Sequence, residues 1–205
     1  MTKELTKRIL SSIIILPLAF YFLLSGSLMS IIFIIICFFI ACYEWHKMTK
    51  NSFHKISGLI FLFFSFYTFY ILSIELYFLI FVILISVSTD IGGYVFGKIF
   101  KGPKLTKISP KKTFAGAIGS LILCSILVSV LFYYLMDYYN YKIVIIAFIT
   151  SIFCQIGDLL FSFLKRKAKL KDTGKILPGH GGILDRLDGI FLGLPFGLTT
   201  LILLN

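Results

Sequence analysis

Phe114 to Met136 reads FAGAIGSLILCSILVSVLFYYLM, a run in which no side chain carries a charge. About 20 consecutive apolar residues cross the hydrocarbon core of a bilayer as a helix, so this stretch predicts a transmembrane helix. Similar runs surround it, and each is a predicted span: Ile9 to Leu24, Ser27 to Tyr43, Ile56 to Leu72, Ile74 to Val95, Ile143 to Leu164 and Gly189 to Leu204. The sequence therefore predicts an all-α polytopic membrane helix bundle with about seven transmembrane helices.

The composition agrees with a membrane protein. Of the 205 residues, 59% are hydrophobic, whereas about half is usual for a soluble domain. The short loops between the apolar runs predict a single integral membrane domain over residues 1–205. The net charge of +11 does not indicate nucleic-acid binding, because no soluble module remains to carry such a surface. The four cysteines lie in or beside apolar runs and are expected to be buried small hydrophobic residues.

The lysines and arginines predict how the chain crosses the membrane. With the N-terminus in the cytoplasm, all of them except Lys142 fall on the cytoplasmic side. This is the positive-inside pattern, and it predicts a multi-pass protein of a bacterial-type inner membrane. It also places two long polar segments, residues 90–116 and 157–189, in the cytoplasm. The same bias can explain each lysine taken singly, without any catalytic role.

The first polar segment reads DIGGYVFGKIFKGPKLTKISPKKTFAG, from Asp90 to Gly116. Its glycines and the sequence Ser109-Pro-Lys-Lys-Thr113 suit a turn whose amides and ammonium groups meet phosphate. A basic loop with a proline turn is also common before a transmembrane span, so a purely structural role for this loop stays open.

The second polar segment reads SFLKRKAKLKDTGKILPGHGGILDRLD, from Ser162 to Asp188. It combines a basic run with acids and a glycine-rich turn. Cations suit phosphates, carboxylates suit Mg²⁺, and glycines let a backbone approach a bulky anion. Asp185 and Asp188 are three residues apart and would share a helix face, which capping alone hardly explains. The segment predicts a site for a phosphorylated substrate at the bilayer edge.

Asp158 and His180 are candidates for chemistry. Asp158 lies in an apolar run, where an ionisable group costs a few kcal/mol and is functional by default, although a structural salt bridge is an alternative. His180 could be a general base, a phosphate donor or a turn residue. Carboxylates this few and dispersed suit Mg²⁺ completed by phosphate and water rather than a Ca²⁺ loop. No zinc-type spacing, nucleophile elbow or Walker A motif occurs.

At these residues the chain resembles the phosphatidate cytidylyltransferase family, also called CDP-diacylglycerol synthases. The family's signature is matched by Ser162, Lys165-Arg166, Lys171-Asp172, Leu177-Pro178, His180-Gly181-Gly182, Asp185-Arg186 and Asp188. Gly157-Asp158-Leu159, Asp90-Ile-Gly-Gly-Tyr94 and the Ser109 to Thr113 sequence also resemble the family. The resemblance covers roughly Asp90 to the C-terminus. The chain departs from the family pattern at Ala115, where an acid is frequent.

The resemblance implies a reaction in which CTP and phosphatidate give CDP-diacylglycerol and pyrophosphate. It implies Mg²⁺ held by Asp158 and Asp185, with Asp90 and Asp188 as alternative or supporting ligands, and a homodimer in the lipid bilayer. The implied catalytic residues are Asp158, Asp185, Lys165, Arg166, Lys171, Asp172, His180 and Arg186. The implied substrate-binding residues are Asp90, Ser109, Lys111, Lys112, Ser162, Gly181, Gly182 and Asp188.

Two other readings remain open from the sequence. A related CTP-dependent transferase or kinase could act on a polyprenol or an ether lipid with the same anionic site. An anion or metal transporter would place Asp158 on a pathway, but it should show polar residues through several spans. Here the polar residues cluster toward one side of the membrane, which disfavours the transporter.

Overall fold

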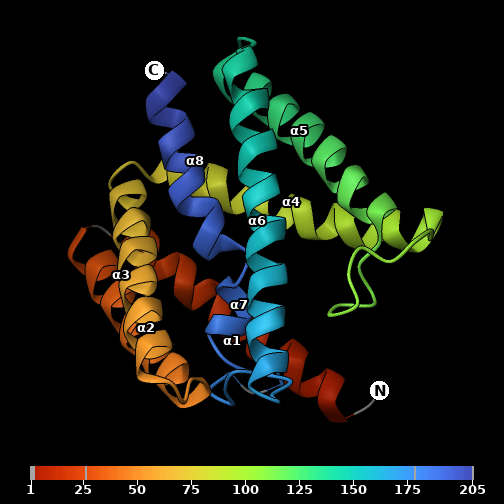
Figure 1. Ribbon diagram of the computed structural model, residues 1–205. Helices are drawn as coiled ribbons and strands as arrows, with labels where there is room; N and C mark the ends of the chain where they lie inside the picture. The colour runs from red at the N-terminus through yellow and green to blue at the C-terminus, as the bar shows by residue number, and fades with distance from the viewer. Residues whose placement is uncertain (1–2, 26, 178, 205) are drawn as a thin grey trace. The chain divides into compact units, whose positions relative to one another are not determined.

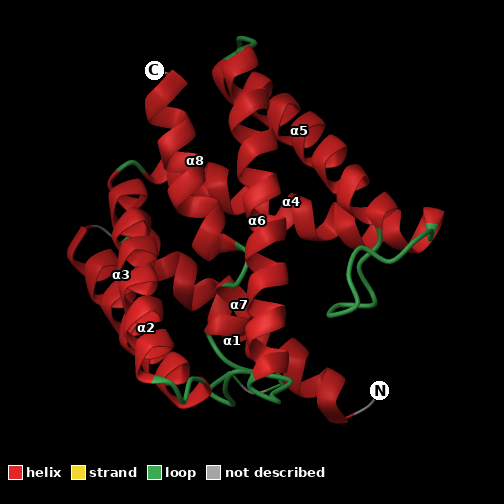
Figure 2. Ribbon diagram, viewed as in Figure 1, coloured by secondary structure: helices red, strands yellow, loops and turns green. Residues whose placement is uncertain are grey.

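The computed structural model describes residues 3–25, 27–177 and 179–204, and the regular structure of these residues is helical (Figures 1 and 2). Pro178 of the signature lies outside the described residues. The helices are α1 (Lys3–Leu24), α2 (Ser27–Met48), α3 (Ser52–Ile74), α4 (Leu76–Phe100), α5 (Phe114–Met136), α6 (Tyr141–Lys167), α7 (Leu184–Leu187) and α8 (Ile190–Leu204). The prediction of an all-α protein is confirmed.

Five of these helices are long and apolar enough to cross a membrane. They contain the segments Leu28–Met48, Ser52–Ile74, Leu76–Phe100, Phe114–Leu135 and Tyr141–Lys167. The apolar part of α1, Ile13–Leu24, and the whole of α8 are shorter. Each predicted span therefore corresponds to one helix, and the protein is a polytopic helical membrane protein. The predicted start at Ile74 was wrong, because Ile74 ends α3 and α4 begins at Leu76, and Gly189 lies just before α8.

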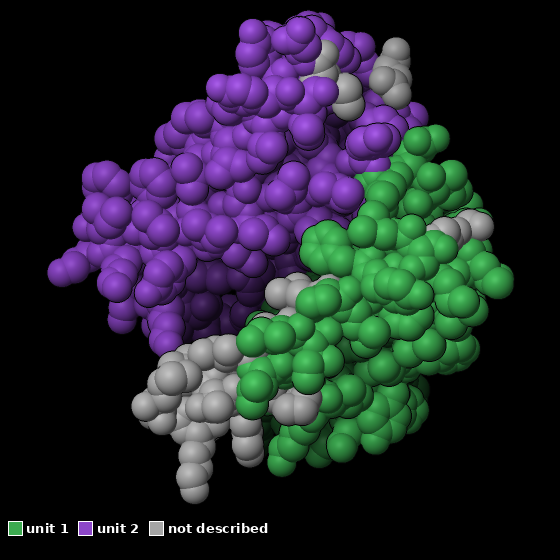
Figure 3. Space-filling view, turned by 180° about the vertical axis from the view of Figure 1, so that it is seen from behind, with its two compact units in different colours: residues 1–76, 164–188 green, residues 77–163, 189–205 purple. Residues whose placement is uncertain are grey.

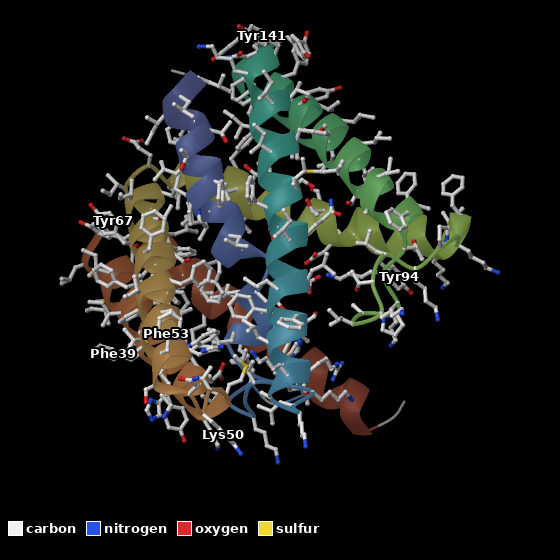
Figure 4. The ribbon with its side chains drawn as sticks, in the orientation of Figure 1. Phe39, Lys50, Phe53, Tyr67, Tyr94 and Tyr141 are labelled. Carbon is white, nitrogen blue, oxygen red and sulfur yellow. The ribbon has the colours of Figure 1, made fainter. Side chains whose placement is uncertain are left out.

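Large aromatic side chains cover the outer faces of these helices. Phe39, Phe53, Tyr67, Tyr94 and Tyr141, which are labelled in Figure 4, are each more than half exposed. Such exposure would be unfavourable in water and is expected where the surroundings are lipid chains and headgroups. The aromatic surface thus agrees with the membrane location that the helix lengths indicate.

The contacts within the chain group it into two compact units, which Figure 3 distinguishes by colour. Unit 1 comprises Met1–Leu76 with Leu164–Asp188, and unit 2 comprises Tyr77–Phe163 with Gly189–Asn205. The single membrane domain expected from the sequence stays a prediction. The two loops of interest, between α4 and α5 and between α6 and α7, belong to unit 2 and unit 1 respectively (Figure 2).

Unit 1 is organised by α2, which packs against α1 and α3 and also touches α7. The α2–α3 hairpin is locked by Trp45, whose indole nitrogen donates to the carbonyl of His54 at 3.2 Å. The Trp45 ring fills the space that a side chain at Gly58 would need, so glycine is required there. This locking fixes the end of α2 that lies beside the α6–α7 loop (Figure 1).

Unit 2 has its core between α4, α5 and α6. Ile85, Cys124, Val128, Ile146 and Ala147 form a buried apolar cluster there. The helix α8 joins α6 through stacked rings of Phe153 and Phe196, whose centroids lie 3.4 Å apart. The four cysteines are free; Cys124 and Cys154 are buried, and Cys37 and Cys42 partly so.

Glycines allow α4 and α5 to cross closely at the end that carries the first polar segment. A side-chain carbon added to Gly116 would lie 2.6 Å from the carbonyl oxygen of Gly93 and 3.3 Å from the α-carbon of Gly97. The α5 helix begins at this crossing, where Thr113 caps it by accepting a hydrogen bond of 3.1 Å from the Gly116 amide. The close crossing therefore positions the loop that precedes α5.

Candidate active site

Unit 2 contains a cavity of about 230 Å³ bounded by α4, the loop before α5, α5 and α6. Four of the charged residues predicted from the sequence line it: Asp90, Lys111, Lys112 and Asp158. They come from three separate stretches of the chain, and the fold of unit 2 brings them together.

Within this cavity, Lys112 forms an ion pair with Asp158. Both side chains are partly exposed to the cavity. Ser162, one turn along α6, is 3.5 Å from the other carboxylate oxygen of Asp158, a long contact. The ion pair gives the acid in the apolar run a partner, and the loop lysine carries the positive charge into the cavity.

The loop between α4 and α5 is held in shape by its own backbone. The Leu105 amide donates to the Lys112 carbonyl at 2.8 Å, and the Phe114 amide donates to the Pro103 carbonyl at 3.1 Å. Ser109 lies in the turn between them, where its carbonyl accepts from the Lys112 amide at 3.0 Å. Ser109 thus shapes the turn, and its predicted contact with substrate stays a prediction.

In unit 1, the signature segment folds into one ion-paired turn. Lys165 Nζ, at the end of α6, donates to Asp185 Oδ1 at 2.9 Å and to Asp188 Oδ2 at 3.3 Å. The three side chains are largely buried, between 5% and 18% exposed. The Lys165 ammonium group therefore bridges Asp185 and Asp188, the two acids that their spacing predicted to share one helix face.

The second oxygen of Asp185 organises the backbone of the turn. Asp185 Oδ2 accepts from the Thr173 amide at 2.8 Å, the Thr173 hydroxyl at 3.0 Å and the Gly182 amide at 2.9 Å. Burial raises the pKa of this carboxyl, but the hydrogen bonds from Gly182, Lys165 and Thr173 outweigh burial and hold the pKa below its ordinary value. Asp185 is thus a stabilised carboxylate at the centre of the turn.

The glycine-rich part closes the turn. The Leu177 amide donates to the Gly181 carbonyl at 2.9 Å, and Gly181 adopts a positive φ of 90° that disfavours any other residue. The Arg186 guanidinium donates to the His180 carbonyl through Nε at 3.0 Å and Nη2 at 2.6 Å. His180 Nδ1 lies 2.8 Å from the Ser11 hydroxyl of α1. Arg186 and His180 therefore stabilise the turn, and their catalytic roles stay predictions.

The remaining predicted cations and one acid face outward. Arg166, Lys171 and Asp172 are exposed, and Arg166 Nη1 donates to the Leu170 carbonyl at 3.2 Å. Exposure leaves the Arg166 and Lys171 side chains available to an anionic ligand. Their roles in binding phosphate, and the catalytic role of Asp172, stay predictions.

The carboxylates of these two regions can be compared with what Mg²⁺ requires of its ligands. The described residues contain no group of three or more His, Cys, Asp or Glu side chains arranged to hold a metal. Mg²⁺ needs only one or two carboxylates when phosphates and water complete its shell. Asp90 and Asp158 meet that requirement because both line the unit 2 cavity. Both oxygens of Asp185 accept hydrogen bonds, Oδ1 from Lys165 and Oδ2 from Thr173 and Gly182, so its place among the metal ligands stays a prediction.

One residue of this site was missed by the sequence reasoning. Glu44, near the end of α2, is 1% exposed and accepts hydrogen bonds from the Ile183 and Leu184 amides of the signature segment. Its Oε2 also lies 3.1 Å from the Thr173 hydroxyl. It is the only acid in the apolar run 28–48, which is the signal that could have found it.

Comparison with known proteins identifies relatives along most of the chain. A profile of the Cytidylyltransferase family matches residues 6–79 and 71–204. The phosphatidate cytidylyltransferase of Rickettsia typhi is 40% identical over 176 residues, which cover 76% of this chain and 74% of the relative. That of Rickettsia prowazekii is 39% identical over 166 residues, covering 74% and 72%. The enzyme of the same name from Staphylococcus haemolyticus is 44% identical over 124 residues. In that alignment the chain spans only 47% of the relative's length.

Proposed function

The chain belongs to the cytidylyltransferase family, and on this basis we propose that it converts CTP and phosphatidate into CDP-diacylglycerol and pyrophosphate. The observation that carries the proposal is the signature segment, which forms one turn with Lys165 paired to Asp185 and Asp188. The unit 2 cavity, with its own lysines and acids, supports it.

The chemistry suits an enzyme with many cations and no strong base. An oxygen of the lipid phosphate attacks the α-phosphorus of CTP, and the bond from that phosphorus to the oxygen bridging it to the β-phosphate breaks. The electron pair leaves with pyrophosphate. Because the attacking oxygen is already anionic, the reaction needs alignment and charge neutralisation more than proton removal.

The residues of this chain would supply both needs. Lys111 and Lys112 line the unit 2 cavity and would bind phosphate oxygens there. In the signature segment the exposed cations would bind the triphosphate or the lipid phosphate: Arg166, Lys171 and Arg186. Gly181 and Gly182 would let the backbone lie close to the nucleotide, with Lys165 held in place by its two acids.

Mg²⁺ is the cofactor that this reaction implies, and it would neutralise charge on the departing pyrophosphate. Asp158 would hold it together with Asp185, as the sequence predicts. Asp90, which lines the same cavity as Asp158, is the alternative second ligand. Asp188 shares Lys165 with Asp185 and would support the arrangement.

We further propose that the protein lies in the inner cell membrane as a homodimer, with both polar loops in the cytoplasm, where CTP is found. Labelling of a cysteine-free protein carrying Thr106→Cys tests the orientation. An impermeant thiol reagent should label this position in inverted vesicles and not in intact cells. Ready labelling in intact cells would contradict the proposed orientation.

The activity is tested with the purified full-length protein, phosphatidate and CTP carrying a phosphorus label. Cytidylyl transfer moves the α-phosphorus into lipid, and a kinase would move the γ-phosphorus instead. We expect lipid labelled only from α-labelled CTP, with release of pyrophosphate and dependence on Mg²⁺. Labelling from the γ position with a polyprenol or diacylglycerol acceptor would establish the kinase alternative.

A further inference from the structure

The carboxylate of Glu44 is buried in a helix that is long and apolar enough to span the membrane. Its side chain is 1% exposed, and its helix contains the span Leu28–Met48. The ion pairs found in the described part of the chain join other residues. A buried ionisable group in such a segment is costly and calls for compensating hydrogen bonds.

These hydrogen bonds all come from the signature segment. Glu44 Oε1 accepts from the Ile183 amide at 3.1 Å, and Oε2 accepts from the Leu184 amide at 3.0 Å. Both amides lie at the start of α7, where Ile183 provides no side-chain cap of its own. Glu44 therefore caps α7 from another helix and satisfies backbone donors that would otherwise be buried without partners.

Two glycines make room for this carboxylate. A side-chain carbon on Gly174 would lie 2.5 Å from Glu44 Oε1, and one on Gly182 would collide with both carboxylate oxygens. From the sequence, Gly182 was expected to let the chain approach a nucleotide. The structure adds a second requirement at this position, because the backbone must close around Glu44.

Thr173 links Glu44 to the acid at the centre of the turn. Its hydroxyl lies 3.1 Å from Glu44 Oε2 and 3.0 Å from Asp185 Oδ2. Asp185 in turn holds Lys165 at 2.9 Å. A continuous set of contacts thus runs from α2 through the turn to the cation that the proposed reaction uses.

We propose that Glu44 is a positioning residue, which fixes the α7 start and Thr173 so that Asp185 and Lys165 take their reactive arrangement. The proposal rests on the proposed function for its effect on turnover. Its structural part, the fixing of the signature turn by a buried acid of α2, can be tested separately. Displacement of a catalytic group by about 1 Å can cost about 100-fold in rate.

The test compares Glu44→Gln with Glu75→Gln, which makes the same chemical change at an exposed acid. Limited trypsin digestion of the full-length protein in detergent reports on the turn through cleavage after Lys175. Cleavage after Lys107, in the other loop, reports on unit 2. We expect Glu44→Gln to accelerate cleavage after Lys175 about tenfold, because lost hydrogen bonds to a charged group favour local opening. Cleavage after Lys107 should not change, and Glu75→Gln should match the wild type at both sites.

A second variant approaches the same contact from the turn. Thr173→Val removes the shared hydroxyl, and it should loosen the turn in the same way as Glu44→Gln. The effects of the two changes should be non-additive in the double variant, because both remove one connected set of contacts. Independent, additive effects would overturn the linkage through Thr173.

Turnover separates the positioning role from general support of the fold. With phosphatidate and CTP, Glu44→Gln should lower kcat about 10- to 100-fold, with a smaller change in KM for CTP. Equal acceleration of cleavage at both loops would show that Glu44 supports the whole fold and would overturn the proposal. Wild-type cleavage and turnover would overturn it as well. Loosening of the turn in a protein whose wild type makes no CDP-diacylglycerol would contradict the proposed function and leave the fixing of the turn intact.

Discussion

Lys165 Nζ lies 2.9 Å from Asp185 Oδ1, so a cation from the beginning of the signature is paired with an acid from its end. The pair closes the segment on itself and leaves Asp185 Oδ2 to organise the backbone amides of Thr173 and Gly182. The charge at the centre of the turn is therefore shared between residues that the sequence separates by a long loop.

The first prediction concerns the stability of the signature turn at acidic pH. Since hydrogen bonds hold the pKa of Asp185 below its ordinary value, ionised Asp185 stabilises the folded turn. This stabilisation is fully present above the unfolded pKa of about 3.9 and is lost as pH falls through the lower folded value. Hydrogen exchange of the signature segment, corrected for intrinsic rates, should accelerate in that window. Asp185→Asn should lack this acid-dependent step, and the exposed change Asp172→Asn should retain it.

The second prediction concerns the metal. Asp158→Asn should lower turnover roughly 1,000-fold, because it removes a charge that binds a hard cation at the departing pyrophosphate. If Asp158 and Asp185 hold one ion, the double Asn variant should fall no further than either single variant. Near wild-type turnover of folded Asp158→Asn at saturating Mg²⁺ would make this carboxylate structural.

Titration with Mg²⁺ identifies the second ligand. Loss of a ligand should raise the Mg²⁺ concentration needed for half-maximal rate, as expected for Asp185→Asn. If Asp185 acts only by holding the turn, its Asn variant would be slow at every Mg²⁺ concentration with an unchanged midpoint. A shifted midpoint in Asp90→Asn would then assign the second ligand to the unit 2 cavity.

The third prediction compares two lysines of the loop before α5. Lys112 reaches Asp158 in the cavity, whereas Lys107 is exposed and does not line it. Lys112→Ala should lower kcat/KM about tenfold or more, because a phosphate contact of a charged group is lost. Lys107→Ala should have an activity close to the wild type. Equal losses in the two variants would indicate that only the bulk positive charge of the loop matters.

The fourth prediction tests the shape of a cation in the signature segment. Arg166 is exposed, and its planar guanidinium can bind phosphate through two donors, which lysine imitates poorly. Arg166→Lys should therefore lose activity while the protein still inserts into the membrane. Lys169, outside the signature positions, should tolerate Ala. Similar losses from Arg166→Lys and Lys169→Ala would exclude a specific role for the guanidinium.

The fifth prediction concerns the crossing of α4 and α5. Gly116→Ala should destabilise the protein, because the new carbon would lie 2.6 Å from the Gly93 carbonyl oxygen. Gly93→Ala adds a carbon with nothing within 4 Å and should be neutral or stabilising. Thermal unfolding in detergent measures both changes. A stable Gly116→Ala protein would show that the two helices can separate without cost.

Much of the fold follows from local sequence. The bilayer core offers no water to backbone amides, so long apolar runs form helices whatever their neighbours, and Phe114 to Met136 does so. The grouping of polar residues into two loops was likewise evident from the sequence. The boundaries of shorter elements were less evident. Residues Leu184–Leu187, for example, form the separate helix α7 just before the last predicted span.

The sequence named these charged residues but not their pairings. The sequence singled out Lys112, Asp158, Lys165 and Asp185, and the fold pairs the first two with each other and the last two with each other. Nothing in residue spacing decides that Lys112 meets Asp158 rather than Asp90, which lines the same cavity. Packing of α4, α5 and α6 makes that choice.

By itself, the sequence determined that this chain is a helical membrane protein with the signature segment of its family, since apolar length and motif spacing are local properties. Only the tertiary structure decided that Glu44 of α2 caps α7 and shares Thr173 with Asp185. A hydrogen bond acts over about 3 Å, and a carboxylate buried among apolar helices takes its partners from whatever the packing brings within that distance. Such partners are far away in the chain, and the sequence around Glu44 carries no trace of them.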